Sequence, residues 1–248
     1  MGTLFRAGQP QSHTANVLAE VSNACQVVQK VENEEKQGKA LIDEALKHNI
    51  KHFVYASVER GGEEKSWSSP TNVPHFASKH NIEHHLRDSV ATQSGSDKMA
   101  WTVLRPVAFM NNLEPGFGMK VFMTALRTEL GGQKPLQWTS VEDVGYFGAQ
   151  AFLHPEKYNN KAMGIAGDTL TMSDMDAMWR RTTGVPLPET YGLLGSALLW
   201  GVKEMGEMVH WFKNKGFSVD VPALRKTHPG LLTFEQWILT KSKFQRQI

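Results

Sequence analysis

Residues 80–84 spell H-x-x-E-H, and they are the first candidates for chemistry in this sequence. On a helix, His80 and His84 share one face with Glu83 beside them, which is the arrangement of the inverted zinc-protease motif. A third ligand is not evident downstream, and so short a motif often matches by accident. We therefore expect no metal, and we interpret His84 and His85 as surface residues of a helix.

Other residue types give little support for hydrolysis or for ligand stacking. The sequence contains no G-x-S-x-G, and Gly195-Ser196 falls within an apolar helical pattern that indicates packing. The rings of Trp200, Trp211 and Trp237 are large enough to stack on a ligand. Large aromatic residues at helical spacing are usually core, however, and we expect that role for all three.

The composition excludes several functions. The 248 residues are 40% hydrophobic. Their formal net charge is only +2, whereas a dedicated nucleic-acid-binding protein has a strongly basic surface. The single cysteine, Cys25, forms neither an internal disulfide nor a zinc cage, which suits a reducing compartment. No secretory signal is visible, and charged residues interrupt the most apolar stretch, Gly192 to Phe212. We expect a soluble cytoplasmic or nuclear protein without direct nucleic-acid or membrane binding.

Strands and helices alternate in the first half of the sequence. Valine-rich Cys25 to Val31 predicts a strand, Glu34 to His48 a helix, and His52 to Ser57 a buried strand. A polar loop through Gly61-Gly62 and Ser66 to Pro70 is expected to follow. The next elements are a helix over about 74–89 and a strand over 101–104. This alternation predicts an α/β fold with a parallel sheet covered by helices.

The second half, from about Gly116, is richer in helix and methionine, and we expect a lobe that covers a site. Its predicted strands are 134–138 and 162–166. The predicted helices are one over 141–152 capped by Ser140, one from Thr171 or Ser173 to near Gly184, a single long helix over 193–212, and one over 233–237.

A glycine-rich phosphate-binding turn is missing from the front of the sequence. The first twenty residues hold Gly2 and Gly8, but no G-x-G-x-x-G follows an apolar strand. The strand predicted at Cys25 to Val31 would then lie at a sheet edge, which favours dimerisation or aggregation. We expect an N-terminally truncated or cropped chain, or an edge covered by the N-terminus or by another chain, with a homodimer through the exposed edge as one form.

Five segments of the sequence resemble the NmrA-like family, atypical short-chain dehydrogenase/reductase relatives common in fungi. They occur in the family's order and span most of the chain from about Asn23 on: 34–43 (EEKQGKALID), 52–62 (HFVYASVERGG), 74–83 (PHFASKHNIE), 104–112 (LRPVAFMNN) and 222–230 (PALRKTHPG).

The resemblance implies a Rossmann-type parallel sheet with helices on both faces that binds NADP or NAD, with a mild preference for NADP. It also implies a smaller, mostly helical C-terminal lobe. We expect one NmrA-like domain over 1–248, in which about 20–115 form the Rossmann-type part and 116–248 contribute the substrate lobe. The sequence departs from the family at the missing glycine motif.

The resemblance also implies a site. Short-chain reductases use a Ser, a proton-donating Tyr and a Lys four residues later. Ser57 and Lys79 match here, while His75 stands at the Tyr position and can itself carry protons. Ser57, His75 and Lys79 would be catalytic, and Ser57 and Lys79 would contact the cofactor.

The segment after the strand at 101–104 would complete that site. By resemblance, Pro106, Val107, Ala108 and Phe109 would approach the nicotinamide, and Phe109, Met110 and Asn112 would face substrate. Structural roles are open for all of these residues. Ser57 can cap a turn, Lys79 can be solvated, Phe109 and Met110 can be core, and Asn111 or Asn112 can cap the next helix.

Three functions are consistent with these residues. The first is an NAD(P)-dependent oxidoreductase acting on a small carbonyl or imine. The second is a non-catalytic redox-sensing regulator that binds a partner protein, which the missing Tyr favours. The third is a cofactor-free scaffold doing non-redox chemistry or a truncated inactive fragment, which the missing glycine turn favours.

Overall fold

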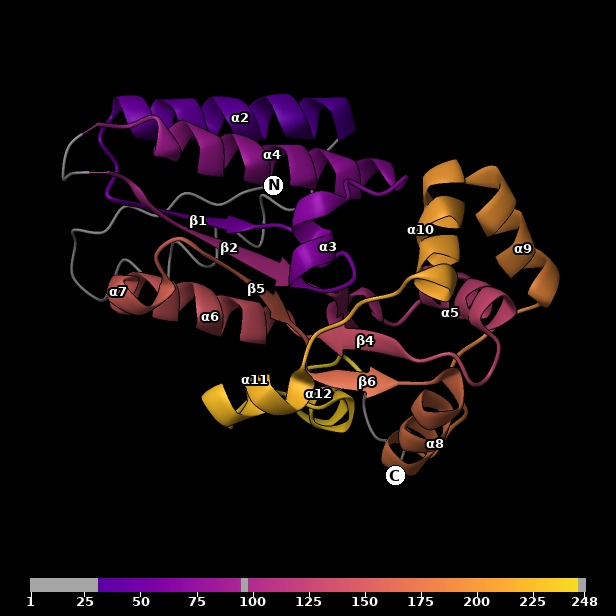
Figure 1. The fold of residues 1–248 in the computed structure, drawn as a ribbon. Helices are drawn as coiled ribbons and strands as arrows, with labels where there is room; N and C mark the ends of the chain where they lie inside the picture. The colour runs from indigo at the N-terminus through magenta and orange to yellow at the C-terminus, as the bar shows by residue number, and fades with distance from the viewer. Residues whose placement is uncertain (1–30, 95–97, 245–248) are drawn as a thin grey trace. The chain divides into compact units, whose positions relative to one another are not determined.

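The computed structural model describes residues 31–94 and 98–244. The chain divides into two compact units, each built from separate stretches of sequence (Figure 1). The described part of the first unit is 31–94, 98–105 and 144–164, and that of the second is 106–143 and 165–244. Each unit is described by itself.

Among the described residues, a three-stranded sheet forms the centre of the first unit. Its strands are β1 (His52–Ala56), β2 (Ala100–Pro106) and β5 (Lys161–Ile165), in the order β1-β2-β5. β1 and β2 are parallel, with His52 opposite Ala100 and Ala56 opposite Leu104. Nearly every residue of these two strands is buried, as expected for parallel strands covered on both faces. The predicted α/β fold with a parallel sheet is confirmed.

Helices cover both faces of this sheet (Figure 1). α2 (Val31–Lys47) and α4 (Pro74–Ala91) lie side by side on one face, while α6 (Val141–Leu153) and α7 (Pro155–Tyr158) lie on the other. α2 and α4 approach each other closely at Gly38, where a Cβ would overlap the Ile82 side chain. The absence of a side chain at Gly38 permits this close packing. The core between these helices and the sheet contains Ile42, Phe53, Tyr55, Ile82, Leu86 and Val103.

A short helix, α3 (Glu63–Ser68), occupies the stretch predicted as a polar loop. That prediction is wrong because E-E-K-S-W-S has too few apolar residues to show helical spacing, and tertiary contacts of Ser66 and Trp67 hold the turn. The strand predicted over Cys25 to Val31 lies outside the described residues except for Val31, which begins α2.

The second unit contains a smaller sheet and most of the helices. Its strands β3 (Ala108–Phe109), β4 (Leu136–Thr139) and β6 (Asp168–Leu170) have the order β3-β4-β6, parallel and then antiparallel. The helices are η1 (Met110–Asn112), α5 (Phe117–Leu130), α8 (Met172–Thr183), α9 (Gly192–Gly201), α10 (Lys203–Asn214), α11 (Val221–Thr227) and α12 (Phe234–Thr240).

Two expectations for this unit are wrong. The single helix predicted over 193–212 is divided at Val202, which leaves helical geometry between α9 and α10. The break lets Gly206 pack against the Leu199 carbonyl, where a side chain would not fit. Trp211 and Trp237 are buried as expected, but Trp200 at the end of α9 is 91% exposed. No helix in the described part of the chain is long and apolar enough to cross a membrane.

Candidate functional site

Ser57 lies directly after β1, at the carboxyl ends of two parallel strands. Its backbone N–H donates to the Leu104 carbonyl at 2.7 Å, which continues the β1–β2 ladder by one residue. The side chain is buried, and its hydroxyl donates to Glu83 Oε1 on α4. Ser57 is thus at the predicted place, and its proton is directed at an internal carboxylate.

Glu83 is the centre of a buried ionic cluster. Arg60 Nη2 and Arg105 Nη2 each donate to Glu83 Oε2 at 2.7 Å, and the three side chains are almost completely excluded from solvent. Burial alone would raise the pKa of Glu83, but the hydrogen bond from Arg105 and the charges of both arginines lower it. Glu83 is therefore ionised, and two guanidinium groups share one carboxylate.

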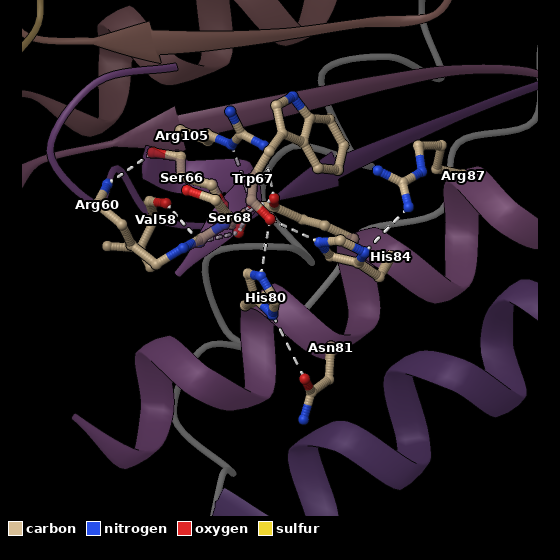
Figure 2. Close-up of polar contacts among 12 residues, drawn as sticks. Val58, Arg60, Ser66, Trp67, Ser68, His80, Asn81, His84, Arg87 and Arg105 are labelled. Atoms are coloured by element: carbon tan, nitrogen blue, oxygen red, sulfur yellow. Dashed lines mark hydrogen bonds and ion pairs between the residues drawn. The ribbon is translucent and has the colours of Figure 1, made fainter. Parts of the chain in front are cut away.

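Arg60 and Arg105 also fix the loop and helix that follow β1. Arg60 Nη1 donates to the Val58 carbonyl at 2.8 Å, and the Arg60 backbone N–H donates to Ser66 Oγ at 2.9 Å. The Arg105 guanidinium lies 4.4 Å from the Trp67 ring centre, a cation–π contact (Figure 2). These contacts hold α3 beside the ends of β1 and β2.

Lys79 is bound by a second carboxylate. Its ammonium forms an ion pair with Glu34 of α2, and Ser78 Oγ donates to Glu34 Oε2 at 2.6 Å. Burial alone would raise the pKa of Glu34, but the Lys79 charge and the hydrogen bonds from Lys79 and Ser78 lower it to about 2. The predicted cofactor-binding lysine is therefore in an ion pair between α2 and α4.

His75 lies one helical turn before Lys79, as predicted. It is half-buried, and its ring meets the Phe76 ring edge-on at 4.7 Å. Within the first unit, Ser57 and Lys79 hydrogen-bond to different carboxylates, Glu83 and Glu34.

Residues 106–112 belong to the second unit. Pro106 and Val107 are buried, and the Val107 N–H donates to Ile165 O at 3.2 Å. Ala108 and Phe109 are half-buried and pair with Trp138 and Thr139 in the sheet.

Met110 is fully buried, which matches the core role left open for it, and Asn112 is exposed. Asn111 Oδ1 accepts from the Val141 N–H at 3.0 Å, so Asn111 caps α6 rather than the next helix. The predicted cofactor and substrate contacts of 106–109, Met110 and Asn112 stay predictions.

The two histidines of the H-x-x-E-H motif lie together, but Glu83 does not join them. His80 Nε2 and His84 Nε2 lie 3.0 and 2.9 Å from the same acceptor, the Trp67 carbonyl oxygen (Figure 2). Glu83 instead binds the two buried arginines. In the part of the chain that the structure describes, no group of three or more His, Cys, Asp or Glu side chains could hold a metal ion. The motif therefore fixes α3 to α4.

Sequence reasoning missed the partners of the predicted residues. Glu34, Arg60, Glu83 and Arg105 were not assigned roles, although Arg105 carries a charge at the end of an apolar strand, which is a signal for a buried pair. Tyr55 was also missed. Its hydroxyl is buried without a hydrogen-bond partner among the described residues, and burial raises its pKa, with the Glu34 and Glu83 charges adding to the effect.

The model of the NmrA-like family matches residues 8–236. The chain belongs to the NmrA-like family. Solved structures agree on the fold. A crystal structure of NmrA, a negative transcriptional regulator, in complex with NAD is 18% identical with a TM-score of 0.57, covering 84% of this chain and 69% of that one. NmrA in complex with NADP gives the same coverage, with 18% identity and a TM-score of 0.58.

An enzyme of another kind has the same fold. A nucleoside-diphosphate-sugar epimerase from Staphylococcus aureus is 10% identical with a TM-score of 0.60, covering 86% of this chain and 74% of that one. At these identities the likeness establishes the Rossmann-type fold alone. The activity must be argued from the residues of this NmrA-like protein.

Ser57 and Lys79, the two residues predicted to contact the cofactor, each have a carboxylate partner within the chain. The Ser57 hydroxyl donates to Glu83, and the Lys79 ammonium is paired with Glu34. Any contacts of residues 1–30 with the phosphates lie outside the described residues.

Proposed function

We propose that this NmrA-like protein is a regulator in the cytoplasm or nucleus that binds NAD or NADP and does not transfer hydride. Whether the dinucleotide is bound changes how the protein binds a partner protein. One observation carries the proposal: the two side chains that would orient substrate and activate a proton donor, Ser57 and Lys79, are each held by a carboxylate of the chain itself. The family match and the NAD and NADP complexes of NmrA support the dinucleotide as ligand.

The chemistry of proton donation argues against a reductase. A general acid works best when its pKa lies near the working pH, and a free lysine beside it provides the positive charge that lowers the pKa of a phenol. Here Glu34 neutralises Lys79, and position 75 is a histidine. Tyr55 does not replace the missing phenol, because its pKa is raised.

Calorimetric titration of the folded chain with NADPH, NADH, NADP⁺ and NAD⁺ tests the binding half of the proposal. We expect affinity for at least one dinucleotide. A chain that is folded by circular dichroism but binds none of the four would overturn the regulator and favour the cofactor-free scaffold.

Nicotinamide absorbance tests the catalytic half, with a panel of small aldehydes, ketones and imines. We expect no turnover by the wild type. Turnover that disappears in His75→Ala and in Lys79→Met, with dinucleotide binding retained in His75→Ala, would show an oxidoreductase with His75 as its acid.

A further inference from the structure

Two histidines hold α3 against α4 through a single backbone oxygen. His80 Nε2 and His84 Nε2 lie 3.0 and 2.9 Å from the Trp67 carbonyl oxygen, and their ring centres are 4.3 Å apart (Figure 2). A carbonyl oxygen only accepts hydrogen bonds, so each imidazole must carry a proton on Nε2. Both donors of this contact therefore belong to the side chain whose charge changes near neutral pH.

Arg87 determines the charge state of His84. Arg87 Nη2 lies 3.0 Å from His84 Nδ1. A guanidinium has only donors, so Nδ1 must be the acceptor, and His84 is neutral while this contact is made. A second proton on His84 would go to Nδ1, where two donors and two positive charges would then meet. Arg87 also lies 5.1 Å from the Trp67 ring centre, so its displacement loosens another contact of α3.

His80 is also held in its neutral form. Burial lowers its pKa from 6.5, the charges of His84 and Arg60 lower it further, and the hydrogen bonds with the Trp67 carbonyl and Asn81 only partly oppose this. The folded state thus binds this proton more weakly than a released His80 does. The stabilisation by neutral His80 is complete above pH 6.5 and is lost as the pH falls below that value.

Charged groups lie around the histidine pair on every neighbouring element. The buried charges beside it are Arg60 after β1, Arg105 in β2 and their shared carboxylate Glu83, so they are net positive. The other charged or titratable groups of α2, α3 and α4 near the pair are exposed or bonded elsewhere: Glu63, Glu64 and Lys65 are exposed, Asp88 binds Arg87, His85 binds Asp43, Lys79 binds Glu34, and Glu35 binds Lys39 and Asn81.

We propose that His80 and His84 form a proton-operated latch, which holds α3 on α4 while both rings are neutral and releases it when either ring gains a second proton. The other described contacts of α3 use Arg60 and Arg105, which stay charged over this pH range. A helix of six residues is not stable alone in water, so a released α3 loses its backbone hydrogen bonds. Release uncovers Trp67 and the Arg105 guanidinium, whether or not a dinucleotide binds.

Hydrogen exchange of the full chain, read by mass spectrometry and corrected for the intrinsic pH dependence of exchange, tests the latch. Relative to the amides of α2, protection of the 66–69 amides should fall about ten- to a hundredfold from about pH 7.5 to about pH 5.5, roughly tenfold for each histidine that must stay neutral. In His80→Gln/His84→Gln the change should be less than about twofold, because glutamine keeps an N–H donor and does not titrate. The matched control is His85→Gln, whose histidine binds Asp43 at 2.7 Å, and it should keep the wild-type profile.

Nitrogen NMR of the histidine rings tests the same contacts in the wild type, so that the decision does not depend on the folding of a variant. At about pH 7.5, His80 and His84 should both be neutral, with the proton on Nε2. A proton on Nδ1 of His84 at that pH overturns the proposal. Wild-type protection of the 66–69 amides that is equal at both pH values also overturns it, as does a folded double variant that keeps the full wild-type pH dependence.

Discussion

Glu83 holds Arg60, Arg105 and Ser57 together in a space closed to water. Removing one partner of a buried ion pair costs far more than the pair contributes net, because the remaining charge stays desolvated. We therefore expect Glu83→Gln to lower the free energy of unfolding by about 3–5 kcal/mol in urea titration.

The matched control for that variant is Glu63→Gln, at an exposed position of α3, which should change stability by less than about 0.5 kcal/mol. A Glu83→Gln variant as stable as this control would contradict the buried cluster.

Glu34 makes stability depend on pH. Its pKa is lowered from 4.5 to about 2, so the folded state binds its proton more weakly than the unfolded chain does. The stabilisation is complete above pH 4.5 and is lost as the pH falls toward 2. At about 1.4 kcal/mol per pKa unit, it amounts to about 3 kcal/mol at neutral pH.

Urea unfolding measured across that pH range in the wild type and in Lys79→Met checks this prediction. The variant should lose most of the pH dependence assigned to Glu34, because the lysine that lowers the pKa is gone. Identical pH profiles would show that Lys79 is not the cause.

At the scale of elements, the tight contact of Gly206 with the Leu199 backbone fixes the α9–α10 hairpin. A methyl group there must displace backbone, so Gly206→Ala should cost about 1–3 kcal/mol of unfolding free energy. Gly145→Ala in α6 is the control. Its Cβ would meet nothing within 4 Å, and we expect a gain of about 0.5–1 kcal/mol.

Local signals in the sequence predicted some of these elements, but not α5, α11, β3 or β6. Thr171 and Thr233 each form a capping box, and Gly184 ends α8 in the left-handed conformation, so short-range chemistry decides these boundaries. The division of α9 from α10 was missed because the apolar pattern continues through Val202. Contacts with distant residues decide such breaks.

The candidate site was less predictable than the fold. The positions of Ser57 and Lys79 followed from the sequence, but their hydrogen-bond partners did not. Glu83 lies 26 residues after Ser57 in the sequence, and Glu34 lies 45 residues before Lys79. Which carboxylate reaches a hydroxyl or an ammonium depends on helix packing, and no local pattern encodes it.

For the whole molecule, dinucleotide binding should appear as added stability. A ligand that binds only the folded state at a hundred times its Kd adds about 2.7 kcal/mol. We expect NADPH or NADH to raise the urea midpoint of the wild type and of His75→Ala alike, since His75 has no binding role in a regulator. An unchanged midpoint at millimolar dinucleotide would contradict binding.

The two units alternate along the chain, and this order affects how the protein is made. The sheet of the first unit receives its third strand, β5, only after residues 106–160 have been synthesised. At about 5–20 residues per second, the ribosome needs roughly 3 to 12 seconds to extend the chain from Arg105 to the end of that strand. During this time the β2 edge of the nascent sheet has no β5 to pair with, and an open edge invites association with other chains. Slow translation of the stretch between β2 and β5 should therefore lower the yield of folded protein.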